Sequence, residues 1–188
     1  MLNGDRLIEF DSVLTDIIFD NWVKLLDELD IVNQVYLYTI SKNLMPVDMR
    51  LSFMTELAEP LVEIVIAEKK YFPSLKPGSR GTSLKQCLDV LINQYGRIIF
   101  QKEMNSDYDY LLSTLVSSRV RIMHIKRDQP KERYFDGIES IRYMKKLSLL
   151  YRVVLFELLG IDEDIYRGRL ENATKFIDTW NSRNRISD

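Results

Sequence analysis

The stretch "DGIESIRYMKKLSLLYRVVLFELLG", residues 136–160, decides the fold because it has the clearest helical pattern in the chain. Its apolar residues recur three and four positions apart, the spacing that gathers side chains on one face of an α-helix. The residues of this face are Ile138, Ile141, Met144, Leu147, Tyr151, Val154, Leu155 and Leu158. Asp136 and Glu139 have the spacing of a capping box, and Gly160 is typical of a helix end. The stretch therefore predicts one long amphipathic helix.

Helical periodicity continues on both sides of this stretch. Residues 14–43 predict extra N-terminal helices, and residues 162–181 predict a C-terminal helix with acids in its first turn. Residues 35–40, "VYLYTI", have strand-forming side chains, but they lie between helical patterns and we assign them to helix. The N-terminal side chains expected to face the core are Leu14, Ile17, Ile18, Trp22, Leu25 and Leu26.

The middle of the chain predicts further helices separated by two loops. Residues 48–72 read as a helix with a kink at Pro60, because the proline ring removes a backbone donor and crowds the preceding turn. Two segments rich in Pro, Gly and charge, 72–83 and 127–134, predict loops. With 188 residues and 46% hydrophobic composition, the chain predicts a single all-α domain, an up-and-down bundle of about five to seven helices.

Composition narrows the function classes. A formal net charge of −2 gives no global attraction to nucleic acid or to an anionic membrane, and no motif that reads DNA sequence is present. One Cys and one His cannot supply the usual ligands of a structural zinc site, so we expect no metal and no cofactor. The lone Cys and the lack of an apolar segment long enough for export or membrane insertion predict a cytoplasmic protein.

One feature of the segment "SSRVRIMHIK", residues 117–126, calls for a functional explanation. On an ideal helix Arg119 lies near the centre of an apolar arc of about half the circumference, His124 lies just past its edge, and Arg121 points to water. The apolar residues of this arc are Leu111, Leu112, Leu115, Val116, Val120, Ile122 and Met123. A guanidinium buried without partners costs several kcal/mol, so Arg119 must have a carboxylate, a facing subunit or an anion beside it.

Two interpretations of Arg119 remain open. It can form a structural ion pair with an acid of a neighbouring helix, for which Glu59 and Glu63 are candidates. Alternatively, it shares a functional site with His124. The two side chains are about 140° apart on an ideal helix, so they meet only if the helix loosens near His124 or a second copy approaches. A symmetric dimer would bring two arginines and two histidines to one cleft.

Positive charge is concentrated beside this pair. Between residues 119 and 133 there are six cations and two acids, which gives 6 − 2 = +4 in a protein whose net charge is −2. The cations are Arg119, Arg121, Lys126, Arg127, Lys131 and Arg133. A solvated basic loop explains the loop residues but does not explain Arg119.

The order of these features resembles the ApeA-like group of HEPN domains found in prokaryotic defence proteins. That group has a core like "TRNYLTH", and this chain has "SRVRIMH" in the same position late in a helix, followed by a polar loop and a long helix that ends in "LLG". The likeness extends from "RLSFMTELAE", where Glu59 falls at the group's usual acid, to "YRVVLFELLGIDEDI". The corresponding core covers about residues 47–165.

This resemblance implies a homodimeric helical bundle that acts as a metal-independent endoribonuclease in defence or in a toxin-like role. Arg119 and His124 would be the catalytic pair, Glu59 a supporting acid, and the products a 2′,3′-cyclic phosphate and a 5′-hydroxyl. The residues expected to hold RNA phosphates are Arg121, Lys126 and Arg127. The chain departs from the group at Val120, where a polar residue is usual, and members without the full polar set can be non-catalytic. The alternative is therefore a dimerisation, RNA-binding or protein-interaction module in which Arg119 is a structural ion pair.

Overall fold

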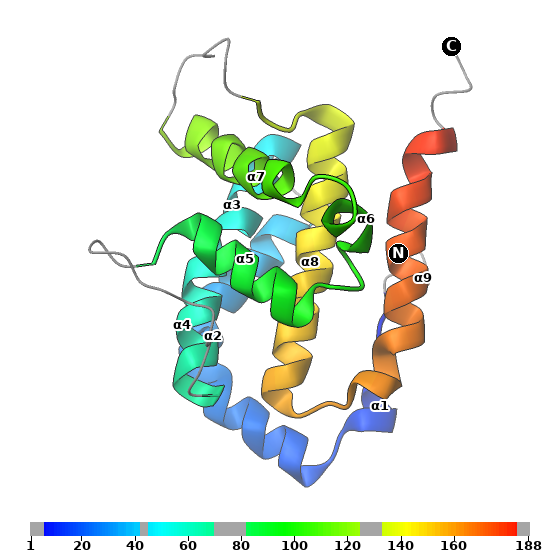
Figure 1. The fold of residues 1–188 in the computed structure, drawn as a ribbon. Coiled ribbons are helices and arrows are strands. Elements are labelled where there is room, and N and C mark those ends of the chain that lie inside the picture. Colours follow the sequence, from blue (N-terminus) through cyan, green and yellow to red (C-terminus); the bar gives the residue numbers. More distant parts are fainter. Residues whose placement is uncertain (1–5, 42–44, 70–81, 125–132, 184–188) are drawn as a thin grey trace.

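A computed structural model describes residues 6–41, 45–69, 82–124 and 133–183, and within these ranges every regular element is a helix (Figure 1). The helices are α1 (Phe10–Val13), α2 (Asp16–Ile40), α3 (Val47–Glu56), α4 (Ala58–Lys69), α5 (Leu84–Tyr95), α6 (Gln101–Met104), α7 (Tyr108–Met123), α8 (Gly137–Leu159) and α9 (Glu163–Arg183). Only α1 and α6, with 4 residues each, are short. The predicted all-α helical bundle is confirmed.

Helix α8 occupies the centre of the bundle and packs against α2, α3, α4, α5 and α9 (Figure 1). The predicted apolar face is buried at Met144, Leu147 and Val154, but Tyr143 and Leu150 on other sides of the helix are buried as well. Ile138, assigned to the same face, is 48% exposed in the first turn. A helix enclosed by five neighbours buries its whole circumference, which an amphipathic pattern does not predict.

The sequence predicted the C-terminal end of α8 correctly and its N-terminal end incorrectly. Gly160 ends the helix with φ of 79°, a left-handed conformation that glycine adopts without steric cost, as predicted. The predicted capping box is wrong, because the Asp136 side chain accepts no capping hydrogen bond. Instead, the N–H of Glu139 donates to the Asp136 carbonyl at 3.0 Å, and the Ser140 hydroxyl donates to Asp48 Oδ1 of α3 at 2.6 Å.

The segment expected to be one kinked helix is divided into two, α3 and α4. The break lies at Leu57, whose N–H ends the ladder of α3 by donating to the Phe53 carbonyl at 3.2 Å. Pro60 falls in the first turn of α4, where its missing N–H has no partner to lose. Since Pro60 cannot donate back to Glu56, the helical ladder is interrupted at Leu57, whose φ of −61° and ψ of −14° keep the chain close to helical, as a kink near Pro60 requires.

Residues 35–40 are helical, as predicted, and the N-terminal region expected to hold more than one helix at 14–43 contains one long helix, α2, preceded by the short α1. The buried side of α2 is formed by Leu25, Leu29, Val32, Tyr36 and Thr39. Three residues predicted to face the core are instead exposed: Leu14 by 46%, Ile17 by 72% and Leu26 by 44%. Leu25 is buried and Ile18 and Trp22 pack against the core as predicted, so the apolar pattern of α2 is broader than its contact with the bundle.

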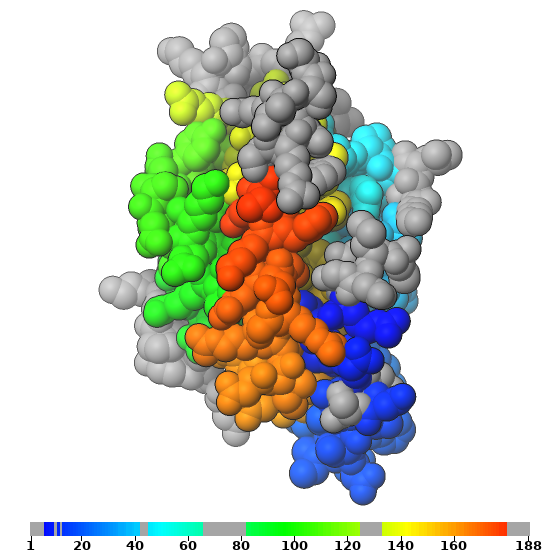
Figure 2. Space-filling model, turned by 90° about the vertical axis from the view of Figure 1, so that its right-hand side faces the viewer, coloured from blue at the N-terminus to red at the C-terminus, as the bar shows by residue number. Residues whose placement is uncertain are grey.

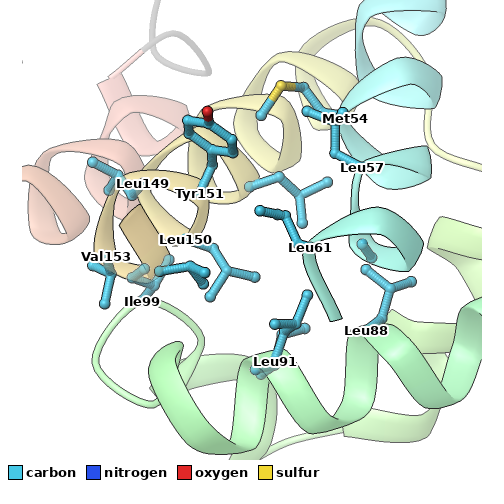
Figure 3. Close-up of a cluster of buried hydrophobic side chains, with 14 of the residues drawn as sticks. Met54, Leu57, Leu61, Leu88, Leu91, Ile99, Leu149, Leu150, Tyr151 and Val153 are labelled. Atoms are coloured by element: carbon cyan, nitrogen blue, oxygen red, sulfur yellow. The ribbon is translucent and has the colours of Figure 1, made fainter. Parts of the chain in front are cut away.

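Apolar side chains from α3, α4, α5 and α8 converge in the core (Figure 3). Met54 and Leu61 face Leu88 and Leu91 of α5 across a small cavity of about 10 Å³, which Tyr151 of α8 also lines. An apolar space of this size holds about one water-sized sphere at most and has no polar group to hold a ligand. The core therefore supplies stability and leaves function to the surface.

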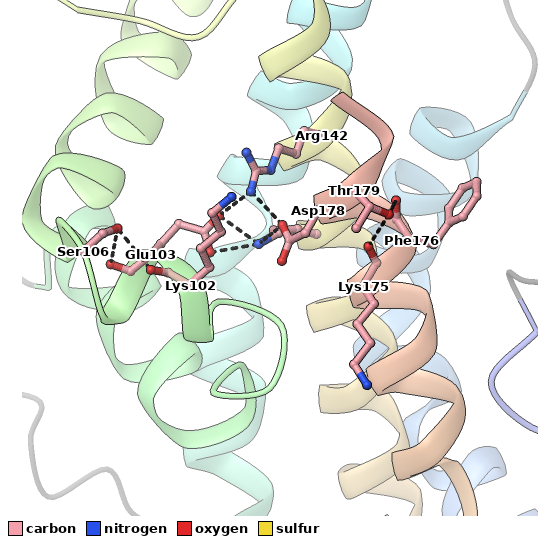
Figure 4. A network of polar contacts seen from close by, with 9 residues as sticks. Lys102, Glu103, Ser106, Arg142, Lys175, Phe176, Asp178 and Thr179 are labelled. Atoms are coloured by element: carbon pink, nitrogen blue, oxygen red, sulfur yellow. Dashed lines mark hydrogen bonds and ion pairs between the residues drawn. The ribbon is translucent and has the colours of Figure 1, made fainter. Parts of the chain in front are cut away.

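A buried ionic cluster fastens α9 to the bundle (Figure 4). The side chain of Lys146 is 0% exposed, and its Nζ lies 2.8 Å from both carboxylate oxygens of Glu103 in α6 and 2.9 Å from Asp178 Oδ1 in α9. Arg142 Nη2 donates to the same Asp178 oxygen at 2.7 Å. Two cations and two acids thus neutralise one another beneath α9, which lies across the outer side of the bundle in Figure 2.

None of the helices in the described ranges is both long and apolar enough to span a membrane.

Candidate functional site

Helices α3 and α7 pack against one another, and this packing places Glu56 of α3 beside Arg119 of α7. Arg119 Nη2 donates to Glu56 Oε1 at 2.7 Å, and Arg119 Nε donates to Glu56 Oε2, so the guanidinium is held by two parallel hydrogen bonds. The Arg119 side chain is 21% exposed and that of Glu56 is 32% exposed. An intrachain carboxylate is therefore present as predicted, but the predicted identity, Glu59 or Glu63, is wrong.

Arg119 lies at the edge of the buried face of α7, not at its centre. The buried residues of this helix are Leu111, Leu112, Thr114, Leu115 and Ser118, and all lie before Arg119. Near the C-terminal end, Val120 is partly exposed and Met123 is 39% exposed. The apolar pattern continues to Met123, but the neighbouring helices do not cover it. Arg119 therefore keeps one edge of its guanidinium close to solvent.

The end of α7 brings His124 back to Arg119. The helix stops at Met123, and His124 has φ of −106° and ψ of 5°, outside the regular helix, while its N–H still donates to the Val120 carbonyl at 3.1 Å. Its Nε2 lies 3.3 Å from Arg119 Nη1. The loosened helix end was one of the two conditions under which these side chains were expected to meet.

The contact between Arg119 and His124 has a defined direction. A guanidinium has donors and no acceptor, so Arg119 Nη1 is the donor and His124 Nε2 is the acceptor. The lone pair of Nε2 therefore points at Arg119, and a bound hydroxyl can give its proton to this nitrogen only by taking the place of Nη1. The arrangement thus sets a histidine base beside a fixed cation.

Acidic side chains determine the charge balance around Arg119. The hydrogen bonds of Glu56, and then its negative charge and that of Glu59, raise the pKa of Arg119, so the guanidinium stays charged. Burial, followed by the charge of Glu56, raises the pKa of Glu59, which Arg119 only partly offsets. Glu59 therefore adds to the electrostatics of the pair while Glu56 makes the contact. Glu63 is exposed.

Two further arginines of the predicted basic surface stack on tyrosines. The Arg121 guanidinium carbon lies 3.8 Å from the centre of the Tyr134 ring, and that of Arg133 lies 5.7 Å from the Tyr110 ring centre. Arg121 was expected to point to water, but it is only partly exposed and covers an aromatic face. The other predicted phosphate-binding residues, Lys126 and Arg127, lie outside the described residues.

Small polar residues that the sequence analysis did not single out hold the end of α7 in place. Ser118 Oγ accepts the N–H of Phe135 at 2.9 Å and donates to the Thr114 carbonyl at 2.7 Å. Ser52 of α3 donates to the Ser118 carbonyl at 3.4 Å and to the Asp48 carbonyl at 3.0 Å. The sequence contained one sign of this role: Ser118 lies on the buried side of an apolar helix. A buried hydroxyl needs a hydrogen-bond partner, so such a serine is expected to connect two segments.

Metal ligands are sparse in the described ranges: no group of three or more His, Cys, Asp or Glu side chains there could hold an ion. Cys87 is buried, and burial followed by the charges of Glu59 and Glu63 raises the pKa of its thiol to about 11. A thiol in that state is a poor nucleophile at neutral pH. The Arg119–His124 pair is therefore the strongest candidate for chemistry among the described residues.

Comparison with known proteins gives one match. The family model described as Apea-like HEPN matches residues 49–165, which is more than half of the chain. The matched region runs from α3 to the start of α9 and contains Glu56, Arg119 and His124, whereas α1, α2 and most of α9 lie outside it. No curated protein and no solved structure matches the chain.

Proposed function

The chain belongs to the Apea-like HEPN family, and on this premise we propose that it is a metal-independent endoribonuclease of a prokaryotic defence or toxin-like system. The observation that carries the proposal is the 3.3 Å contact between Arg119 Nη1 and His124 Nε2. It joins a permanent cation to the one imidazole of the chain at the solvent-facing end of α7. Arg119 and His124 are also the two residues that the family resemblance indicates as the catalytic pair.

The proposed reaction uses the two side chains in different roles. His124 Nε2 takes the proton of a ribose 2′-hydroxyl that has replaced Arg119 Nη1 as its hydrogen-bond donor, and the 2′-oxygen attacks the adjacent phosphorus. Arg119 Nη1 stabilises the negative charge that develops on the phosphate oxygens. The bond from phosphorus to the 5′-oxygen breaks, this oxygen takes a proton from a water molecule, and the proton held by His124 returns to the solvent. The products are a 2′,3′-cyclic phosphate and a 5′-hydroxyl.

Glu56 is a positioning residue in this proposal. Its carboxylate occupies the Nε and Nη2 edge of the Arg119 guanidinium and leaves Nη1 directed at His124. Holding the cation before substrate binds reduces the entropy that would otherwise be lost in the transition state. Glu59, the supporting acid expected from the family resemblance, adds negative charge nearby. The direct contact with Arg119 is made by Glu56 instead.

A homodimer and RNA are the proposed partners. The family resemblance implies that two copies place their Arg and His residues along one cleft. Arg121 in the last turn of α7 supplies positive charge near His124, whereas Arg133 lies over Tyr110 in the first turn of the same helix. The RNA would therefore cross the C-terminal end of α7.

The non-catalytic alternative also has an observation in its favour. Arg119 is already neutralised within its own chain by two hydrogen bonds to Glu56, which is the geometry of a structural ion pair. The position after Arg119 holds Val120, where related domains usually have a polar residue. In this alternative the domain binds RNA or protein without cleaving, and Arg119 fixes the packing of α7 on α3.

Cleavage of RNA in the presence of a chelator separates the two functions. The purified protein is incubated with labelled single-stranded RNA and EDTA, beside Arg119→Ala and His124→Ala. We expect each substitution to lower the cleavage rate by about 100-fold or more. Arg167→Ala in α9 is the matched control, because Arg167 pairs only with Glu163 and Glu171 of its own helix at 3.4 and 3.5 Å in the described structure.

The products and the controls decide the outcome. End-group analysis should find a 2′,3′-cyclic phosphate, and Arg167→Ala should cleave at the wild-type rate. If wild type, Arg119→Ala and His124→Ala all cleave equally or not at all, the ribonuclease proposal is wrong. An Arg119→Ala protein that binds RNA as wild type does and loses only stability would favour the structural ion pair.

A further inference from the structure

Helix α2 exposes an unusual number of large apolar side chains. It packs against α3, α4 and α8 through its buried side, yet seven of its residues are at least 44% exposed. They are Ile17 (72%), Phe19 (55%), Val23 (50%), Leu26 (44%), Ile31 (74%), Leu37 (59%) and Tyr38 (60%). Exposed apolar residues scattered singly need no explanation, but a concentration on one element marks an interaction surface.

Four of these residues form a stripe along the helix. Phe19, Val23 and Leu26 are spaced by four and three positions, and Leu37 continues the same line three turns later. On an ideal helix they fall within an arc of about 60°, separate from the buried side centred on Leu25. We call this set, Phe19, Val23, Leu26 and Leu37, the α2 stripe. Its spacing is that of a helix that packs lengthwise against another helix.

Acidic side chains lie within the α2 stripe and along one side of it. Helix α2 contains five acids and one lysine, 5 − 1, which gives a net charge of −4 against −2 for the whole chain. The acids are Asp16, Asp20, Asp27, Glu28 and Asp30, and all are exposed. Asp30 lies within the stripe itself, between Leu26 and Leu37. A surface of this kind repels the phosphates of nucleic acid and the headgroups of anionic lipid.

A second copy of the chain is also a poor occupant. Pairing of two α2 stripes would set a charge of −4 against another −4, with Asp30 near the middle of each stripe facing an apolar or acidic neighbour. Burying an unpaired carboxylate in such an interface costs several kcal/mol. The occupant that matches both the apolar line and its charge is a helix with leucine-type residues on one face and lysine or arginine beside them.

We propose that the α2 stripe is a docking surface for a cationic amphipathic helix of a partner protein. The surface lies on an element that precedes the region matched by the family, whereas Arg119 and His124 lie within that region. Binding of a partner and RNA cleavage would thus use different residues, so one can be lost without the other.

Two synthetic helical peptides of equal length test the charge and the location together. Both have leucines at the three-and-four spacing; one has lysines and the other has glutamates at the flanking positions. Fluorescence anisotropy with the full chain should show binding of the lysine peptide only. Phe19→Ser with Leu26→Ser should weaken binding by about tenfold or more, because both side chains would be buried in the contact. Asp27→Asn with Asp30→Asn should weaken it severalfold and reduce its dependence on salt.

Matched controls come from α9, where Ile165 is 47% and Phe176 53% exposed. Ile165→Ser with Phe176→Ser should leave peptide binding unchanged, and circular dichroism should show wild-type folding for every variant, because the altered side chains are exposed. Equal binding of both peptides, no binding of either, or equal loss in the α9 control would overturn the proposal. So would a wild-type dimer that becomes monomeric in the α2 variants, since the second copy would then be the occupant.

Discussion

Of the two residues in the Glu56–Arg119 ion pair, only the arginine could be identified from the sequence. A lone arginine among leucines and a lone histidine near it were visible in the sequence. The acid that partners the arginine was not, because the sequence offers Glu56, Glu59 and Glu63 within a few turns. Which of them faces α7 depends on the break at Leu57, and that break depends on how α3 and α4 pack.

We expect Glu56→Gln to impair both stability and activity. The amide replaces a charged, two-fold hydrogen bond with a neutral one, so the free energy of unfolding should fall by about 1–2 kcal/mol, between the values typical of exposed and of buried pairs. RNA cleavage should fall by about tenfold, because the Arg119 guanidinium is no longer fixed. Glu59→Gln is the control and should change both quantities less. Urea unfolding and initial cleavage rates measure the two effects, and equal effects of both variants would contradict the role of Glu56.

Lys146 should be far more important for stability than its exposed counterpart Lys85. Lys146→Met leaves Glu103 and Asp178 with only Arg142 to balance them in a buried place, so we expect a loss of about 3–5 kcal/mol. Lys85→Met removes an ion pair whose acid, Asp109, is 82% exposed, and this should cost much less than the change at Lys146. Urea unfolding compares the two; a loss of under 1 kcal/mol for Lys146→Met would show that the cluster adds little.

Asp178 should make stability fall at low pH. Burial acts to raise its pKa, but the hydrogen bonds and charges of Lys146 and Arg142 together hold that pKa below its ordinary value of 3.8. Since the folded state binds the proton less readily than the unfolded state, the stabilisation is present above the ordinary pKa and disappears as the pH falls below it. Unfolding free energies measured from pH 6 down to pH 3 should decline less steeply in Asp178→Asn than in wild type. Parallel curves would assign the acid sensitivity to other groups.

At the scale of elements, periodicity predicted the helices well and their buried faces poorly. The helical assignment of residues 35–40 was right because neighbouring patterns extended through them. The core-facing side of α2 was placed wrongly at Ile17 and Leu26, since apolar residues on that helix serve two surfaces. For α8 the amphipathic pattern described one face of a helix that is buried on every side. A sequence pattern records which residues avoid water, but packing decides which neighbour covers them.

Two glycines should respond to alanine with opposite signs. Gly160 ends α8 with φ of 79°, where an added Cβ is strained although its nearest new neighbour, Asn21 Nδ2, is 3.6 Å away. We expect Gly160→Ala to lower stability by about 1 kcal/mol. Gly168 lies inside α9 with nothing within 4 Å of an added Cβ, so Gly168→Ala should raise stability by about 0.5–1 kcal/mol. Thermal unfolding by circular dichroism tests both, and a destabilising Gly168→Ala would mean that the helix needs that glycine.

At the scale of the whole molecule, the bundle combines a family core with helices that the family match does not cover. Helix α9 is fastened by Asp178 to Lys146 and Arg142 of α8, so its removal would leave a buried cluster with two cations and one acid. Helix α2 buries Leu25 and Leu29 on one side and presents the α2 stripe on the other. The sequence predicted helices in both places but gave no sign of the cluster, because its members are 75 residues apart, from Glu103 to Asp178.

The location of the active pair relative to the proposed dimer can be tested by mixing two inactive proteins. Arg119 Nη1 and His124 Nε2 are 3.3 Å apart within one chain, so we infer that each chain brings its own pair to the cleft. A mixed dimer of Arg119→Ala and His124→Ala then has no complete pair. We expect co-refolded mixtures to cleave RNA no faster than either variant alone, whereas mixtures of wild type and His124→Ala should keep activity in proportion to the wild-type chains. Recovery in the mixture of the two variants would require an arginine of one chain to act with the histidine of the other. The intrachain contact would then describe only the resting state, and the cleft between copies would be the catalytic unit.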